Sequence, residues 1–223
     1  MGGKLAISLD NVSKSYNGSF NHDIFEKVNL KIELGEFVVA HGPIGSGKTT
    51  LLNLISGLTK PSKGRIQING IDIGAMDNNS LAEMRASTFG IVHQTQNLIP
   101  ELTIVENIEL PLVFLGIGRE ERRKRATESL RKIGIAKMAE RLVGNLSVGE
   151  KEIVAIARSM VGNPAIVLMD EPTEALDPIM AEMVLSLVRG DSLLRKKTII
   201  ITTHDRRIAS IAGRVIHIKR KIP

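Results

Sequence analysis

Hydrophobic and polar residues alternate along the first part of the chain, a pattern typical of β-strands. Residues 5–12, 28–34 and 65–71 alternate in this way, so each is predicted to form a strand with one buried face. Residues 36–40 are an apolar strand that leads into a glycine-rich loop, and residues 51–58 have the pattern of a helix. Strands followed by a glycine loop and a helix indicate the start of an α/β arrangement.

The middle of the chain, roughly residues 95–162, is predicted to be helical. Apolar residues recur there at helical spacing in two stripes, at Ala126, Leu130 and Ile133 and at Ile153, Val154, Ala157 and Met160. The run G-R-E-E-R-R-K-R at 118–125 is rich in positive charge, but Glu120 and Glu121 interrupt it. We therefore interpret this run as the solvated face of a helix and not as a basic binding patch.

Two short runs later in the chain are almost wholly apolar. Residues 165–169 and 198–201 show no alternation, which is typical of parallel strands buried on both faces. In open α/β sheets, ligands gather at the carboxyl ends of such strands. Polar residues that follow these runs are therefore candidates for a site.

Composition narrows the class of protein. The 223 residues are 43% hydrophobic, enough for one substantial domain, and the absence of cysteine excludes disulfides and thiolate chemistry. The N-terminus lacks the apolar segment of a secretory signal, and no run approaches the ~18–20 apolar residues that span a bilayer. We expect a soluble protein, or one that sits on a membrane through a partner.

The net charge of +6 is compatible with an anionic ligand, an anionic membrane surface or nucleic acid, and equally with a lysine-rich solvated surface. Aromatic residues make up only 3% of the chain, too few for a platform that stacks single-stranded bases. No nucleic-acid partner is expected.

The strongest chemical signal is G-P-I-G-S-G-K-T at 42–49, which has the spacing of a phosphate-binding loop between a strand and a helix. Glycines at 42, 45 and 47 let successive backbone N–H groups point at phosphate oxygens, and the helix N-terminus adds its positive dipole. Lys48 supplies a positive charge for the β- and γ-phosphates, and the Thr49 hydroxyl is a ligand for Mg²⁺. The agreement of strand, spacing and helix argues against a chance glycine turn, so the chain is predicted to bind a nucleotide.

A second signal is A-I-V-L-M-D-E-P-T at 165–173, an apolar strand that ends in two acids. Asp170 is predicted to hold Mg²⁺ and Glu171 to accept a proton from an attacking water. Taken alone, the pattern is explained equally well by solvated acids at a strand end. Because the same sequence contains the glycine loop, roles in Mg²⁺ binding and proton transfer are favoured for these acids. His204 follows a third apolar strand, whereas the other histidines show no metal-ligand spacing.

Taken in order, these motifs resemble the nucleotide-binding domain of ABC transporters over essentially the whole chain. The resemblance implies that Tyr16 stacks on adenine, that Gln94 senses Mg²⁺ and the γ-phosphate, and that His204 is the switch histidine. It also identifies L-S-V-G-E at 146–150 as the signature, with Ser147 and Gly149 facing the partner's γ-phosphate, and A-L-D, ending at Asp177, as the loop that crosses to the other subunit. The phosphate loop then comprises Gly42, Pro43, Ile44, Gly45, Ser46, Gly47, Lys48, Thr49 and Thr50.

The resemblance implies a P-loop NTPase (RecA-like) α/β fold with an N-terminal antiparallel β subdomain and an inserted helical subdomain. A single domain is expected, with residues 1–94 and 163–223 forming the core and residues 95–162 the helical signature subdomain. ATP and Mg²⁺ are the implied cofactors. Lys48, Gln94, Glu171 and His204 are the implied catalytic residues, and the metal ligands are Thr49, Gln94 and Asp170.

The family further implies a head-to-tail dimer that closes on ATP and opens after hydrolysis, thereby driving integral-membrane permease subunits that couple near Gln94. The subunit is then expected in the cytoplasm, on the inner face of the cell membrane. The stretch N-L-I-P-E-L-T-I-V-E-N-I-E-L-P-L at 97–112 is similar to the lipoprotein-release and macrolide-export branch.

The sequence departs from the family pattern at four places. Val148 and Glu150 replace the usual glycine and glutamine of the signature, Lys151-Glu152-Ile153 stands where Q-Q-R is common, and Glu174 stands where Ser or Gly often precedes A-L-D. A β-branched Val148 would resist a positive φ but would cost little at a negative one. Ser147 to Glu150 also has the S-x-x-E spacing of a capping box, which would turn the Glu150 carboxylate back onto its own helix.

Three functions remain open at this point. The first is an ATP-hydrolysing subunit of a membrane transporter, and the second is a regulatory or division-type subunit that binds nucleotide but hydrolyses it weakly. The third is a cytosolic ATPase of the same family that acts on DNA or ribosomes; its relatives usually carry coiled coils, zinc insertions or tandem halves, which this sequence lacks.

Overall fold

The computed structural model describes residues 3–16, 22–190 and 197–219. The chain divides into two compact units, residues 1–85 with 196–223 and residues 86–195, and each is described by itself. Within the described residues, no helix combines the length and the apolar character needed to cross a membrane.

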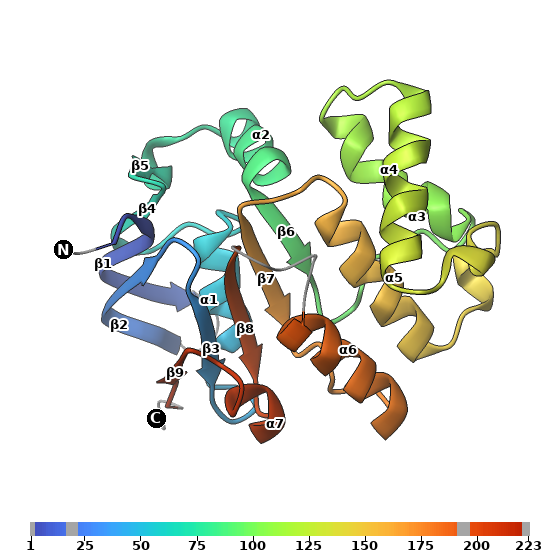
Figure 1. The fold of residues 1–223 in the computed structure, drawn as a ribbon. Coiled ribbons are helices and arrows are strands. Elements are labelled where there is room, and N and C mark those ends of the chain that lie inside the picture. Colours follow the sequence, from blue (N-terminus) through green and yellow to red (C-terminus); the bar gives the residue numbers. More distant parts are fainter. Residues whose placement is uncertain (1–2, 17–21, 191–196, 220–223) are drawn as a thin grey trace. The chain divides into compact units, whose positions relative to one another are not determined.

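An antiparallel sheet of the first unit holds the alternating segments (Figure 1). Its strands, in spatial order, are β2 (His22–Glu33), β1 (Leu5–Tyr16), β4 (Lys63–Ile68) and β5 (Ile71–Asp72). On β1, Ile7 and Leu9 are buried opposite Ile32 and Leu30 of β2 and opposite Ile68 and Ile66 of β4. The prediction that residues 5–12 and 28–34 form strands is confirmed, because alternate apolar side chains point to one face.

The segment 65–71 is only partly a strand. β4 ends at Ile68, and Asn69 and Gly70 form a tight turn with φ of 51° and 83° before β5 begins. Asn-Gly is the preferred pair for a two-residue hairpin because both positions require positive φ. The alternation hid this turn because Ile71 continues the apolar pattern on the other side of it.

Parallel strands of the first unit carry the glycine loop. β3 (Phe37–His41) pairs in parallel with β8 (Thr198–Thr203) and with β9 (Arg214–His217). Val38, Val39 and Ala40 are fully buried, as are the apolar residues of β8. After β3 the chain enters the loop and then α1 (Lys48–Ile55), and after β8 it reaches the short α7 (Arg206–Ala209). The predicted strands at 36–40 and 198–201 are confirmed.

The second unit contains a parallel strand pair and a group of helices (Figure 1). β6 (Phe89–Val92) pairs with β7 (Ile166–Asp170), which is buried along its whole length. The helices are α3 (Ile104–Phe114), α4 (Arg119–Lys132), α5 (Val148–Met160) and α6 (Pro178–Gly190), with 3₁₀ turns at Ala136–Met138 and Val143–Asn145. α3 packs on α4 and α5, and α5 also contacts β6 and α6.

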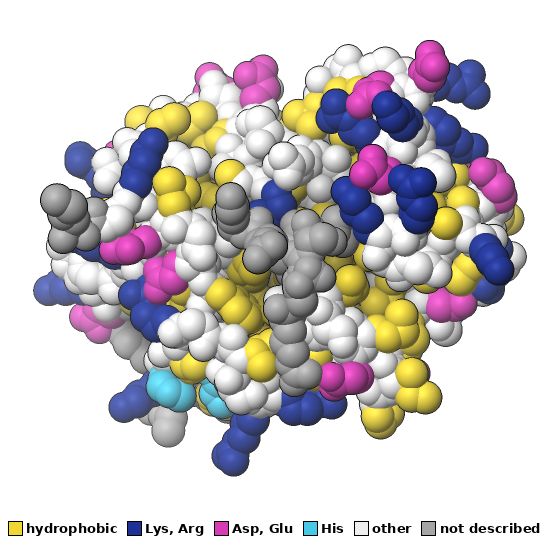
Figure 2. Space-filling model, in the orientation of Figure 1, with side chains coloured by type: hydrophobic (Ala, Val, Ile, Leu, Met, Phe, Trp, Pro, Cys, Tyr) yellow, Lys and Arg dark blue, Asp and Glu magenta, His cyan; other side chains and the backbone are white. Residues whose placement is uncertain are grey.

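Both predicted apolar stripes are buried. Ala126 and Leu130 of α4 and all four stripe residues of α5 are at most 4% exposed. The charged run at the start of α4 lies on the outside, where basic side chains lie beside acidic ones (Figure 2). The interpretation of this run as a solvated helix face is confirmed.

Two helices have weak sequence signals. α2 (Asn78–Thr88) buries only Leu81 among its residues, so it carries no apolar stripe. Asp77 accepts a hydrogen bond from the Ser80 backbone N–H at 2.8 Å and thereby caps this helix. α6 begins at Pro178 after Asp177, a pairing that is typical of a helix start.

Candidate active site

The phosphate loop of the first unit has a backbone that only glycine adopts readily. Gly45 and Gly47 have φ of 77° and 96°, values that L side chains disfavour. A β-carbon at Gly47 would lie 2.5 Å from Cγ2 of Ile24, and one at Gly42 would lie 2.3 Å from the Ile218 carbonyl oxygen. The loop therefore needs glycine at 45 for conformation, at 42 for space and at 47 for both.

Several groups of this loop are suited to binding an anion. The Lys48 ammonium is buried and donates to the carbonyl oxygens of Gly42 and Pro43 at 2.7 and 3.0 Å. α1 begins without a side-chain cap and has no acid in its first turn. The Ser46 hydroxyl is buried without a hydrogen-bond partner among the described residues. A cation, an uncapped helix N-terminus and an unsatisfied hydroxyl in one loop fit a phosphate group.

The other loop residues lie at the surface. Pro43, Ile44 and Thr49 are exposed and Thr50 is half-buried, so Thr49 can reach a ligand over the loop. Tyr16 ends β1 with 45% of its surface exposed, and the Lys14 ammonium lies 4.7 Å from the centre of its ring. Because Lys14 also donates to the Lys60 carbonyl at 2.9 Å, it is held against the ring.

His204 follows β8 with an exposed side chain. Its carbonyl oxygen lies 3.3 Å from Nε2 of His41. The ring of His41 in turn meets that of His217 edge to face at 5.8 Å. The imidazoles of His41 and His217 are therefore packed against each other, and His204 is exposed.

In the second unit, β7 ends in two buried acids. Asp170 is 5% exposed and Glu171 is 9% exposed. Glu171 has φ of 49°, a left-handed conformation that is strained for a non-glycine residue. Pro172 follows at once. A strained, buried acid at a strand end is typical of a reactive position.

The glutamine loop, residues 93–97, follows β6. Gln96 and Asn97 have positive φ, and the Arg158 guanidinium of α5 donates to both of their carbonyl oxygens. Nε2 of Gln96 donates to Oε2 of Glu152, also on α5, at 2.8 Å. The loop is therefore tied to the helix that begins at the signature.

Gln94 lies in this loop with an exposed side chain, and its Nε2 donates to Oε2 of Glu174 at 2.6 Å. Glu174 belongs to the segment that follows Glu171. The structure thus brings Gln94 together with a residue that sequence reasoning noted only as a departure.

Burial affects the protonation of Glu152, which lies beside the loop, and of His93, which belongs to it. Glu152 is 4% exposed and its Oε1 has no hydrogen-bond partner among the described residues. Burial raises the pKa of Glu152 to about 7, although the hydrogen bond from Gln96 opposes the rise. Burial lowers the pKa of His93, with the Asp170 charge opposing and Arg158 adding to the effect, so His93 is neutral at neutral pH.

The signature begins a helix. Ser147 is the N-cap of α5, and its hydroxyl accepts from the Glu150 backbone N–H at 3.2 Å while the Glu150 carboxylate accepts from the Ser147 N–H at 2.8 Å. Arg141 pairs with the other Glu150 oxygen at 3.1 Å. The Ser147 backbone hydrogen bond lowers the pKa of Glu150, so this carboxylate is ionised and already has its partners. The predicted capping box is confirmed.

Val148 and Gly149 have different constraints. Val148 is the first residue of α5, is 49% exposed, and is absent from the residues with positive φ in the described chain. Its β-branch therefore costs little. A β-carbon at Gly149 would lie 2.8 Å from Cγ of Met180 on α6, so this glycine also allows α5 and α6 to pack closely.

Asp177 caps α6. Its Oδ1 accepts from the backbone N–H groups of Ile179 and Met180 at 2.9 and 3.0 Å. The segment from Glu171 to Asp177 therefore ends in a firmly anchored turn.

Sequence reasoning missed Arg158, Gln96 and the contacts made by Glu152 and Glu174. A charged residue among the apolar residues of a helix was the available signal for Arg158 and Glu152, since a buried charge needs partners. Nothing in the sequence pattern pointed to Gln96.

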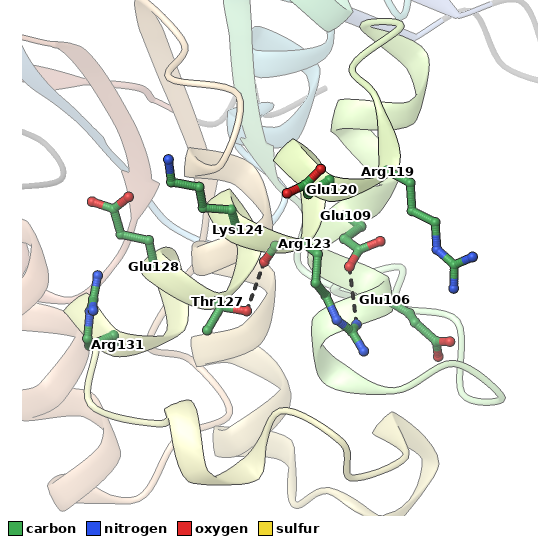
Figure 3. A pocket seen from close by; sticks show the side chains of 9 residues that line it. All are labelled: Glu106, Glu109, Arg119, Glu120, Arg123, Lys124, Thr127, Glu128 and Arg131. Atoms are coloured by element: carbon green, nitrogen blue, oxygen red, sulfur yellow. Dashed lines mark hydrogen bonds and ion pairs between the residues drawn. The ribbon is translucent and has the colours of Figure 1, made fainter.

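An open hollow of about 950 Å³ lies against α3 and α4 and has a different character (Figure 3). Charged residues of both signs line it, among them Arg123, which pairs with Glu109 at 3.1 Å. Because four acidic and four basic side chains line it, its charges balance and it presents no concentrated field to a ligand. We interpret it as part of the solvated face of α4.

Comparisons with known proteins agree with this geometry. A family model described as ABC transporter matches residues 25–174. The chain is 41% identical over 96% of its length to YvrO, an ABC transporter ATP-binding protein of Bacillus subtilis, covering 93% of that protein. It is 38% identical over 96% of its length to a macrolide export ATP-binding/permease protein, MacB, of Hyphomonas neptunium, of which it covers 33%.

Among solved structures, the chain resembles the ATP-binding cassette MJ0796, a protein of Methanocaldococcus jannaschii, in a dimeric post-hydrolysis state bound to ADP and Pi. The TM-score is 0.89 at 39% identity, with 97% of each chain covered. A second dimeric structure of the same cassette has a TM-score of 0.88 at 41% identity and covers 96% of this chain and 94% of its own. The predicted P-loop NTPase fold class is thereby confirmed.

Proposed function

This chain belongs to the family of ABC transporter ATP-binding proteins, and from that premise we propose how its residues share the work of binding and hydrolysing ATP. It is an ATP-binding and ATP-hydrolysing subunit of an ABC transporter. The observation that carries the residue assignment is the phosphate loop, which combines a buried Lys48, two glycines of positive φ and an uncapped helix N-terminus.

In this proposal the triphosphate lies along residues 42–50. Backbone N–H groups of the loop and of α1 donate to phosphate oxygens, and Lys48 exchanges its carbonyl partners for the β- and γ-phosphates. That exchange is favourable because a charged phosphate is a stronger acceptor than a peptide carbonyl. Tyr16 stacks on adenine with the face that Lys14 leaves open, and Lys14 holds the ring in position.

Glu171 is the proposed general base. Its side chain is buried directly after β7 and its backbone is strained, which supports a reactive role for this acid. His204, exposed after β8, is the proposed group that senses the γ-phosphate. Both assignments rest on position at strand ends and on motif.

The oxygen donors Thr49, Gln94 and Asp170 are the proposed ligands of Mg²⁺, and hydroxyl, amide and carboxylate oxygens are the ligands that this ion prefers. When bound, the ion neutralises charge on the phosphate oxygens during transfer. Asp170 is buried at the end of β7, where an ionised carboxylate gains most from a cation partner.

Dimeric relatives support a second nucleotide contact from a partner copy. We propose that Ser147 and Gly149 at the start of α5 bind the γ-phosphate held by the partner, through the Ser147 hydroxyl and backbone N–H groups, and that Asp177 lies at the same dimer interface. The Ser147 hydroxyl accepts from Glu150 and keeps its proton for a phosphate oxygen. Glu150 stays on its own helix and on Arg141.

We further propose that the subunit works at the inner face of the cell membrane, bound to integral-membrane permease subunits. Residues 95–162 would act as the helical signature subdomain, and residues 1–94 with 163–223 as the core. Exposed apolar side chains support a protein contact on this subdomain: Ile99, Val113 and Phe114 are 40%, 47% and 79% exposed. Fusion of a related cassette to a permease in MacB is consistent with such a partner.

The central experiment replaces the proposed base by Glu171→Gln. We expect ATP binding to persist, turnover to fall by about 10²–10⁴-fold, and a stable ATP-bound dimer to appear in size-exclusion chromatography with light scattering. Lys48→Ala serves as the control, because there ATP binding itself should be lost. A monomeric Glu171→Gln chain with the turnover of the unmodified protein would contradict the proposal.

A further inference from the structure

Two of the acids that depart from the family pattern contact the same loop. Glu152 accepts from Gln96 at 2.8 Å and Glu174 accepts from Gln94 at 2.6 Å. We propose that Glu174 is a positioning residue that fixes the side-chain amide of Gln94 with Nε2 toward Glu174 and leaves Oε1 on the opposite side of the amide as a ready metal ligand. The inference rests on the proposed role of Gln94 as a ligand of Mg²⁺.

The chemistry of the two side chains sets the direction of the amide. An ionised carboxylate accepts hydrogen bonds and cannot donate them, so only the nitrogen end of the Gln94 amide can face Glu174. The carbonyl oxygen then points away from Glu174. Since a metal ion binds the oxygen and is repelled by the NH₂ group, this orientation is the one that a ligand role requires.

The backbone beneath Gln94 is already held. Arg158 donates to the carbonyl oxygens of Gln96 and Asn97, and the Asn97 side chain accepts from the Thr95 hydroxyl at 2.9 Å. The principal freedom left in the loop is therefore rotation of the exposed Gln94 side chain. A contact at its amide removes that freedom before the nucleotide arrives.

Glu174 is presented from an ordered turn. Its backbone N–H donates to the Glu171 carbonyl at 3.1 Å, and the N–H of Leu176 donates to Thr173 at 3.3 Å. Asp177 then anchors the end of the segment on α6. The Glu174 carboxylate is therefore attached to an ordered backbone. Its contact with Gln94 connects the glutamine loop to the segment that begins at the proposed catalytic Glu171.

Equilibrium binding of the non-hydrolysable analogue AMP-PNP, measured by calorimetry with Mg²⁺ and with EDTA, tests the inference. The quantity of interest is the factor by which Mg²⁺ tightens binding. Ordering a flexible side chain beforehand is worth about two- to tenfold, so we expect Glu174→Ala to reduce this factor by that amount. The affinity of Glu174→Ala for AMP-PNP in EDTA should equal that of the unmodified chain. Glu120→Ala, which removes another exposed acid, is the matched control and should leave the factor as it was.

A double-mutant cycle separates positioning from a direct effect of charge on the metal. If Glu174 acts through Gln94, then Glu174→Ala has no further effect in a Gln94→Ala chain. An undiminished effect in that background, or no effect in the chain that retains Gln94, would overturn the inference.

A readout independent of nucleotide is the side-chain amide resonance of Gln94 in ¹H–¹⁵N NMR spectra, identified by its loss in Gln94→Ala. We expect Glu174→Ala to move it to the position of a free amide, and Glu120→Ala to leave it in place. An unmoved resonance in Glu174→Ala refutes the contact. A chain that fails to bind AMP-PNP at all refutes the proposed function instead, and the NMR result still decides the contact.

Discussion

The phosphate loop and the glutamine loop both follow buried strands, yet their shapes have different origins. The phosphate loop is shaped by its own glycines, at 45 and 47, whose positive φ values glycine adopts readily. The glutamine loop also has positive φ, at Gln96 and Asn97, but there it is supported by Arg158, whose guanidinium lies 62 and 61 residues away along the chain from the carbonyls it binds. The first loop is encoded locally and the second depends on the tertiary structure.

The difference matters for the family departures. Acids stand at three positions where the family usually has other residues, and each acid has a defined partner. Glu150 contacts Ser147 and Arg141. Glu152 contacts Gln96, and Glu174 contacts Gln94. The substitutions therefore form a consistent set of contacts in the second unit.

The largest expected effect comes from Gly47→Ala in the phosphate loop. A left-handed backbone costs an alanine about 1–2 kcal/mol, and the added methyl would also meet Ile24 and Phe25, adding about 1–3 kcal/mol of overpacking. We expect ATP to bind about a hundredfold more weakly, measured by calorimetry. Gly70→Ala is the matched control, because φ there is 83° but nothing lies within 4 Å. Equal losses of ATP affinity in both variants would show that the close contact at position 47 is irrelevant.

Removing the long-range support of the glutamine loop should have the next largest effect. Arg158→Ala leaves two loop carbonyls without their donor, and we expect the free energy of unfolding to fall by about 2 kcal/mol in urea titrations. Arg125→Ala, which removes an exposed arginine paired with Glu121, should cost less than about 1 kcal/mol. If the two variants are equally stable, the loop is held by its own sequence and the contrast with the phosphate loop disappears.

Glu152→Gln should produce a smaller effect that depends on pH. The folded chain keeps Glu152 protonated up to a pKa of about 7, against 4.5 for an ordinary glutamate, so it binds more protons than the unfolded chain between these values. The free energy of unfolding therefore falls as pH rises through this window. We expect Glu152→Gln to be more stable than the unmodified chain by roughly 1–3 kcal/mol at pH 8, with the gain shrinking towards pH 5.

Urea titrations at both pH values measure this difference. Glu140→Gln, at a side chain that is 72% exposed, is the control and should show no pH-dependent gain. A constant difference between Glu152→Gln and the unmodified chain would mean that Glu152 is ionised in the folded state throughout.

The smallest effect is expected from restoring the common signature with Val148→Gly and Glu150→Gln together. Val148 has a helical backbone and Glu150 is engaged by Ser147 and Arg141, so neither side chain obstructs a phosphate. We expect ATPase turnover to change by less than about threefold, while the weakened cap costs about 0.5–1 kcal/mol of stability. A large gain in turnover would instead identify the protein as a weakly hydrolytic, regulatory member of its family.

Much of the fold followed from hydrophobic periodicity. The strands at 5–12, 28–34, 36–40, 165–169 and 198–201 and the stripes of α4 and α5 were predictable because each buries a regular set of apolar residues. α2 was not, because it buries only Leu81, and the Asn69-Gly70 turn was masked by an apolar residue on its far side. Elements with little buried surface leave little pattern in the sequence.

The phosphate loop, the acids after β7 and the capping box at the signature were determined by the sequence alone. Each depends on backbone geometry or on hydrogen bonds within a few residues, so local residue order is sufficient. Only the tertiary structure decided that Arg158 supports the glutamine loop, that Glu152 is buried beside Gln96, and that Glu174 meets Gln94. These contacts join residues 56 to 80 positions apart, and single-sequence periodicity carries no information at that separation.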